Sequence, residues 1–156
     1  MIIKSKNNDG SWRELYPKTL GSNVTLNDGR TIEDLKEELD SRVPSMSPLW
    51  EGNMYPDGDQ VVIPSKKLAD CPRGWMLRWE GYNPGSGFSN SNYQYVEIPK
   101  LHVLHKNSGA MRFTLGWTGG ELVFKYVYVF NDRLEGHSSN IDGNNNRIAL
   151  SGIFEY

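Results

Sequence analysis

The segment from Val61 to Tyr82 constrains the fold of this chain more than any other. Two extended runs flank a turn rich in Lys, Asp, Pro and Gly, and the second run alternates in character. One face is apolar and the other is mixed: Trp75, Leu77 and Trp79 against Met76, Arg78, Glu80 and Tyr82. A period of two is typical of a half-buried β-strand. We therefore predict a sheet with an aromatic core and with Tyr82 on its wetter side.

Strand-like runs separated by turn sequences continue along the chain. They cover residues 49–55, 60–63, 75–82, 93–98, 111–117, 122–130 and 147–156, with 101–105 as a further candidate. Many short strands at this spacing predict a mainly β domain over residues 44–156, an antiparallel β-sandwich or a jelly roll. Residues 122–130 are apolar on both faces except at Lys125, which predicts a central strand.

The first 43 residues have a different organisation. Residues 2–6 and 12–16 are strand-like and are joined by Asn-Asn-Asp-Gly, so residues 1–30 are predicted to be a small β appendage that anchors the chain. Residues 31–43 are predicted to form a helix that ends at Pro44. Apolar residues at Ile32, Leu35 and Leu39 keep heptad spacing. They would pack on the helix's own domain or form a short self-associating stem.

Charge and composition exclude several classes of partner. The chain has 17 basic and 19 acidic residues, a net charge of −2, so no electrostatic attraction to nucleic acid or to an anionic membrane is expected. No run approaches the roughly 20 apolar residues that span a bilayer. The N-terminus lacks the apolar core of a signal peptide. Cys71 is the single cysteine, so no intrachain disulfide is expected.

No motif in the sequence supports catalysis, a cofactor or a metal ion. His102 and His105 are three residues apart, but on a strand their rings would point to opposite faces. Asp142 begins a stretch that resembles a calcium loop, but Arg147 and Ile153 stand where such a loop needs Gly and Glu. We therefore expect an Asn-rich turn there and a non-enzymatic protein without cofactors.

Tyrosines near the glycine-rich loop at residues 81–87 are the candidate binding residues. By alternation, Tyr82, Tyr93 and Tyr95 point away from the tryptophan-rich face. Exposed aromatic rings stack on sugar rings, because a flat polarisable surface meets C–H edges. Tyrosine is equally common at protein interfaces. The sequence therefore leaves a glycan site and a protein contact as alternatives.

Two regions resemble distal tail proteins of siphophages that infect Gram-positive bacteria, in particular Bacillus-phage-like tail-fibre and baseplate proteins. Residues 10–19, GSWRELYPKT, with residues 23–29 are similar to their N-terminal region. Their C-terminal domain is similar to Leu49-Trp-Glu-Gly, residues 63–68 (IPSKKL), residues 71–75 (CPRGW), Trp79, Ile98-Pro99, residues 125–128 (KYVY), Gly136-His, Asn140 and residues 153–156 (IFEY).

The resemblance implies a virion protein of the distal tail that is made in the host cytoplasm and needs no signal peptide. It implies a homotrimer with Ile32, Leu35 and Leu39 in the oligomer contact. It also implies an adhesin-like head that contacts cell-wall polysaccharide or teichoic acid. The alternative is a structural accessory protein that binds other phage tail proteins. The chain departs from this pattern in its short stem, which is limited to residues 31–43.

Overall fold

The chain divides into two compact units, residues 1–42 and 43–156. The computed structural model describes residues 3–15, 24–45, 47–117 and 120–156. The first unit contains the antiparallel pair β1 (Ile3–Lys6) and β2 (Trp12–Leu15) and the helix α1 (Ile32–Arg42). These are the predicted hairpin and helix, although the predicted strand ends at residues 2 and 16 lie outside the described residues.

A capping box begins helix α1. The Thr31 hydroxyl accepts a hydrogen bond from the Asp34 N–H at 3.1 Å, and the Asp34 carboxylate accepts one from the Thr31 N–H at 2.7 Å. None of the helix residues is buried. Isolated helices of this length are marginal in water, so the local cap alone does not account for the stability of α1.

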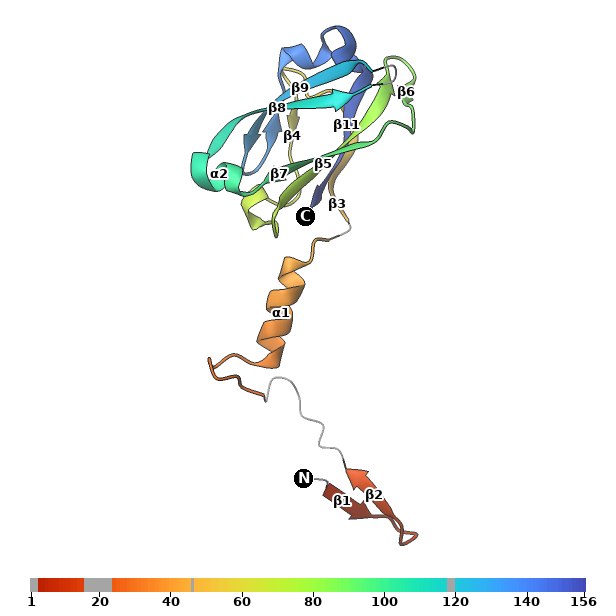
Figure 1. Cartoon of the computed structure of the whole chain (residues 1–156), viewed down its shortest axis with the longest axis vertical. Coiled ribbons are helices and arrows are strands. Elements are labelled where there is room, and N and C mark those ends of the chain that lie inside the picture. Colours follow the sequence, from red (N-terminus) through yellow and green to blue (C-terminus); the bar gives the residue numbers. More distant parts are fainter. Residues whose placement is uncertain (1–2, 16–23, 46, 118–119) are drawn as a thin grey trace. The chain divides into compact units, whose positions relative to one another are not determined.

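The second unit is mainly β, as predicted, and contains two antiparallel sheets (Figure 1). Its strands are β3 (Pro48–Met54), β4 (Val61–Val62), β5 (Gly74–Asn83), β6 (Gly87–Phe88), β7 (Gln94–Pro99), β8 (Ser108–Gly116), β9 (Leu122–Phe130), β10 (Leu134–Glu135) and β11 (Ile148–Glu155). One sheet has the order β4-β10-β9-β8, and β9 is internal to it, as predicted. In the other, β11 lies between β3 and β5, and β5 also pairs with β6 and β7.

Short helical segments connect the strands. They are η2 (Leu68–Asp70), α2 (Leu101–Lys106), η3 (Ser138–Ile141) and η4 (Gly143–Arg147). The prediction of a further strand at 101–105 was wrong, because this segment forms α2. The Val103 and Leu104 N–H groups bond to the Lys100 carbonyl, and only Val103 is buried. A run of five residues is too short for its apolar pattern to separate a strand from one helical turn.

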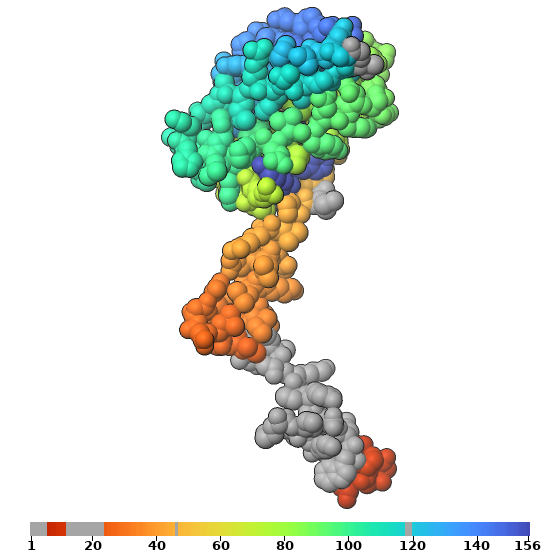
Figure 2. All heavy atoms as spheres, in the orientation of Figure 1, coloured from red at the N-terminus to blue at the C-terminus, as the bar shows by residue number. Residues whose placement is uncertain are grey.

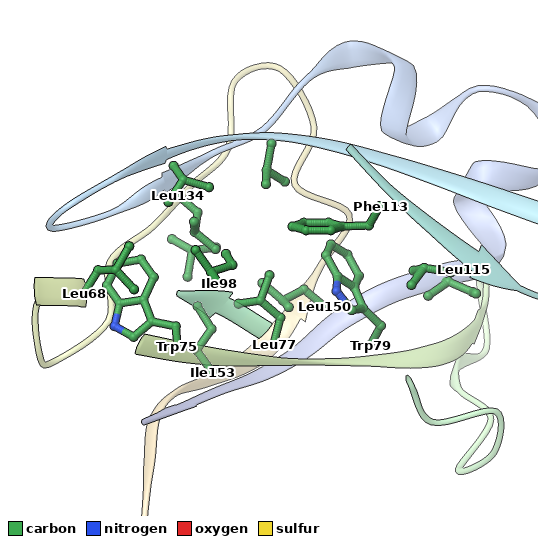
Figure 3. Packing of buried hydrophobic residues seen from close by; sticks show 14 of the residues in the cluster. Leu68, Trp75, Leu77, Trp79, Ile98, Phe113, Leu115, Leu134, Leu150 and Ile153 are labelled. Carbon is green, nitrogen blue, oxygen red and sulfur yellow. The ribbon is translucent and has the colours of Figure 1, made fainter. Parts of the chain in front are cut away.

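The core lies between the two sheets (Figure 3). The predicted tryptophan face is confirmed, since Trp75, Leu77 and Trp79 on β5 are fully buried. β8 contributes Phe113, whose ring centroid lies 6.3 Å from that of Trp79. The apolar face of β5 therefore forms the centre of the sandwich.

The start of β5 requires a glycine at Gly74, the residue before Trp75. Its φ is +155°, and a Cβ at this position would lie 2.1 Å from the Ile98 carbonyl oxygen on β7. Only glycine allows the two backbones to approach so closely. The Pro-Arg-Gly-Trp stretch therefore fixes how β5 enters the sheet.

Candidate functional site

The outward face of β9 carries a row of aromatic side chains. Val123, Lys125, Val127 and Val129 point into the core and are buried, whereas Phe124, Tyr126, Tyr128 and Phe130 alternate with them on the outer side. In Figure 2 the cyan atoms of β8 and β9 lie on the visible surface of the domain. The expectation that this strand is apolar on both faces is correct in composition, but a strand in a two-layer sandwich has only one face in the core.

Charged and aromatic neighbours hold the rings of this row. The Arg112 guanidinium lies 4.4 Å from the centre of the Phe124 ring. Tyr126 packs edge-on against Tyr128, with 5.5 Å between ring centroids, and at a tilt against His137, with 4.8 Å between ring centroids. Tyr128 is 38% exposed. These contacts leave a pre-ordered aromatic surface whose edges carry hydrogen-bonding groups.

A cleft of about 270 Å³ opens beside this row, and we call it the β9 cleft. It is lined by Arg112, Phe124, Tyr126, Ser139 and Asn145. The set combines aromatic faces with a cation, hydroxyl groups and a side-chain amide. Among the described residues, no carboxylate lines the β9 cleft. Such a surface suits a ligand that has both C–H faces and hydroxyl or anionic groups.

Residues 138–147 form the rim of the β9 cleft, and we call them the rim loop. The Asn145 side-chain oxygen accepts the Phe124 N–H at 2.8 Å, and the Asn140 side-chain oxygen accepts the Tyr126 N–H at 2.7 Å. These amides take the place of a neighbouring strand along this edge of β9. The predicted Asn-rich turn at residues 142–146 lies at the 3₁₀ segment η4, which a second 3₁₀ segment, η3, precedes, and one side chain of each segment bonds to β9.

Lys125 is a fully buried lysine beneath the β9 cleft. Its Nζ donates to the Asn140 carbonyl at 3.0 Å and to the Asn145 carbonyl, and it lies 5.4 Å from the Tyr55 ring centre and 5.8 Å from that of Trp79. Burial lowers the pKa of Lys125 to about 7. The sequence marked Lys125 only as a break in an apolar run, because alternation alone did not show which face enters the core.

The opposite sheet has a second cleft, of about 400 Å³, which we call the Tyr95 cleft. It is lined by Pro44, Ser45, Met76, Arg78, Tyr95, Phe154, Glu155 and Tyr156. Its charged groups are already engaged: Arg78 lies over the Phe154 ring and bonds to Ser151, and Glu155 bonds to Lys66 at 2.5 Å. The remaining surface of this cleft is largely aromatic and aliphatic.

The structure places the three candidate tyrosines in two different surroundings. Tyr95 is 60% exposed and lies opposite Arg78 on β5, and Tyr93 is 48% exposed just before β7. Tyr82 is half-buried, with its ring centroid 5.0 Å from that of Tyr55 and 5.5 Å from that of Phe88. Tyr82 pairs with Phe88 on β6 instead of with β7. The loop contacts that bury Tyr82 cannot be read from strand alternation.

The candidate oligomer residues lie along α1. Ile32 and Leu39 are exposed, Leu39 by 61%, and Leu35 is half-buried. Their heptad spacing therefore leaves apolar surface that the described part of this chain does not cover.

The histidines and the cysteine have structural surroundings. The prediction that His102 and His105 lie on a strand, with their rings on opposite faces, was wrong, because both residues are in the helix α2. His102 Nε2 lies 3.3 Å from the Gly109 carbonyl oxygen. Among the described residues, no three His, Cys, Asp or Glu side chains are grouped as a metal ion requires. Cys71 is buried, and burial raises the pKa of its thiol. A protonated, buried thiol is a poor nucleophile.

Comparison with protein-family models, curated protein sequences and solved structures gave no match. No helix in the described part of the chain has the length and apolar character needed to cross a bilayer.

Proposed function

We propose that residues 43–156 form the ligand-binding head of a phage distal-tail protein, a non-enzymatic adhesin for cell-wall polysaccharide or teichoic acid. The observation that carries this proposal is the outward aromatic row of β9 beside a cleft with hydrogen-bonding groups. The resemblance of the sequence motifs to those of siphophage tail proteins supports the virion setting. The absence of a carboxylate from the described lining of the β9 cleft favours binding over glycoside hydrolysis, which generally uses two carboxyl groups.

The lining of the β9 cleft matches the chemistry of such polymers. The Phe124 and Tyr126 rings offer faces for sugar C–H groups. The Asn145 amide bonds to the Phe124 N–H and the Ser139 carbonyl, and the Ser139 hydroxyl bonds to His137, so the second amide N–H and a lone pair of the hydroxyl oxygen are the groups left for sugar hydroxyls. The Arg112 guanidinium is an exposed cation suited to the phosphate groups of a teichoic acid. A phosphate contact would make binding weaker at high salt, whereas stacking on neutral sugars would respond little.

Binding to purified host cell walls tests this proposal. We expect Tyr126→Ala and Arg112→Ala each to weaken wall binding by about tenfold or more, as loss of a central contact does. Tyr93→Ala, at an exposed tyrosine outside the lining of both clefts, is the matched control and should change binding less than twofold. Walls stripped of phosphate polymers separate teichoic acid from neutral glycan. Unchanged binding by the β9 variants, or no wall binding by the oligomeric protein, would refute the adhesin assignment.

A protein contact is the second candidate function, and the Tyr95 cleft favours it. This cleft is largely apolar, its charged groups are engaged within the chain, and Pro44 and Ser45 in its lining follow α1 in the sequence. We propose that this face and the apolar residues of α1 contact another copy of the chain, in a trimer, or another tail protein. This assembly role would remain if the head had no receptor affinity.

Two measurements test the assembly role. Light scattering should show a trimer for the wild-type chain and a smaller species for Leu39→Glu, because a carboxylate in an apolar helix contact costs free energy. Labelled antibody should mark the distal tail of intact virions. A clean monomer would rule out the stem, and absence from virions would rule out both proposed roles.

A further inference from the structure

Lys125 joins the rim loop to the strand that carries the aromatic row. Its Nζ donates to the main-chain carbonyls of Asn140 and Asn145, while the side chains of the same two asparagines accept N–H groups of β9. Asn145 also donates from its side-chain amide to the Ser139 carbonyl at 2.8 Å. Ser139 and Asn145 line the β9 cleft. The hydrogen bonds of the Lys125 amine therefore help to hold Ser139 and Asn145 at the rim of the β9 cleft.

The surroundings of Lys125 contain no group that compensates a positive charge fully. Among the described residues, no carboxylate lies within 4.0 Å of its Nζ. β5 presents Trp79 and the rim loop presents Asn140 and Asn145, none of which titrates. The titratable neighbour is Tyr55, whose pKa is raised by burial and by nearby Tyr82, so it stays neutral. Two carbonyls and two ring faces are a weak substitute for the hydration of an ammonium group.

We propose that Lys125 is a positioning residue that makes ligand binding in the β9 cleft depend on pH: with its amine neutral, the rim loop closes on β9, and protonation favours opening of the loop. Opening would return the ammonium to water and release Ser139 and Asn145 from the cleft. The effect on ligand binding rests on the proposed function of the β9 cleft, whereas the effect on the loop does not.

The sign follows from proton linkage. The amine has a pKa of about 7 with the loop closed and an ordinary value of 10.5 when it is hydrated. The open state therefore binds more protons between these values, and raising the pH favours the closed state. One proton per opening corresponds to about a tenfold fall in the opening constant per pH unit within this window. Below pH 7 both states are protonated and the dependence ends.

Hydrogen exchange of the full-length chain tests the loop without any ligand. The Phe124 and Tyr126 amides donate to the rim loop, so they report its opening. After correction for intrinsic exchange, we expect their protection to rise about tenfold per pH unit from pH 7.5 to 9.5. Lys125→Met should remove this rise, whereas Lys106→Met, at an exposed lysine, should keep it. NMR titration of the wild-type Lys125 amine decides the matter if Lys125→Met does not fold, and a value near 10.5 would overturn the proposal.

Wall binding measured over the same pH range completes the test. We expect affinity to rise with pH for the wild type and for Lys106→Met, and to stay flat for Lys125→Met. Protection that rises with pH without any wall binding would refute the proposed function and leave the loop mechanism standing. Wall binding with pH-independent protection at Phe124 and Tyr126 would refute the role of Lys125 and leave the adhesin assignment standing.

Discussion

The two outer faces of the sandwich place aromatic side chains in different chemical settings. On the β9 face, rings alternate along one strand and border a cleft that exposes a guanidinium, a hydroxyl and an amide. On the Tyr95 face, Tyr95, Phe154 and Tyr156 border a cleft whose Arg78 and Glu155 already have partners within the chain. The exposed Arg112 guanidinium, which lies over the Phe124 ring, favours a polar or anionic ligand, whereas charged groups that are already paired favour an apolar partner surface.

The faces also differ in how they are held. The β9 face depends on side chains of the rim loop, with Asn140 and Lys125 fully buried beneath it. The Tyr95 face is built on the paired strands β5, β7 and β11, and its main buried polar link is Glu155 to Lys66 and to the Ser45 N–H. One substitution can remove the side-chain hydrogen bonds that hold a loop, but it leaves the main-chain hydrogen bonds between paired strands in place. Mutations should therefore affect the two faces unequally.

The largest effect is expected at Asn140. Its side chain bonds to the Tyr126 N–H, the Tyr126 carbonyl and the Pro56 carbonyl at 2.6–2.7 Å. Asn140→Ala leaves these buried groups without partners, so we expect the free energy of unfolding to fall by roughly 3 kcal/mol. Urea denaturation measures the change. Asn144→Ala, at an exposed position in the same loop, is the control and should change it by less than about 0.5 kcal/mol.

If Asn140→Ala lowers the free energy of unfolding no more than Asn144→Ala does, the rim loop does not depend on its buried amide. The two faces would then not differ in how they are held.

Alternation in the sequence was sufficient to predict most of the head domain. The period of two placed Trp75, Leu77 and Trp79 in the core, and turn chemistry separated seven of the nine strands of the second unit, but the two-residue strands β6 and β10 were not predicted. The capping pair Thr31 and Asp34 located the start of α1. These features depend on neighbours in the sequence, and such local rules are what a single sequence contains.

The candidate site could not be predicted from the sequence, because it depends on contacts between residues that are far apart in the chain. The β9 row was not predicted as a surface, because a strand that is apolar on both sides does not reveal which side a second sheet covers. Asn140 and Lys125 are 15 residues apart in the sequence, and no local rule pairs them. Tyr95 was predicted to be on the outer face and is exposed there, whereas the burial of Tyr82 depends on β6 and Tyr55.

An intermediate effect is expected at Glu155 on the Tyr95 face. Burial acts to raise the pKa of Glu155, but hydrogen bonds from Lys66 and the Ser45 N–H outweigh it and lower the pKa below its ordinary 4.5. Its contribution to stability is therefore complete above pH 4.5 and is lost as the pH falls through the folded-state pKa. Glu155→Gln should cost about 1–2 kcal/mol at neutral pH and flatten this acid limb.

Unfolding free energy measured against pH sharpens the comparison between the faces. We expect an acid limb below pH 4.5 that is shallower in Glu155→Gln than in the wild type, and a rise above pH 7 that disappears in Lys125→Met. Each variant should leave the other limb intact, since the two groups lie on different sheets. Loss of both limbs in one variant would show that the faces are coupled.

The smallest effect is expected at the ion pair between Arg78 and Glu51. Its two atoms are 3.3 Å apart, and the Glu51 side chain is 57% exposed. Exposed pairs contribute little, so Glu51→Gln should change the free energy of unfolding by less than about 0.5 kcal/mol, and salt should make this small difference smaller. Arg78 keeps its bonds to Ser151 and its place over Phe154, so the Tyr95 cleft should retain its shape. A loss above about 1 kcal/mol would mean that this face also depends on a side-chain scaffold, as the β9 face does.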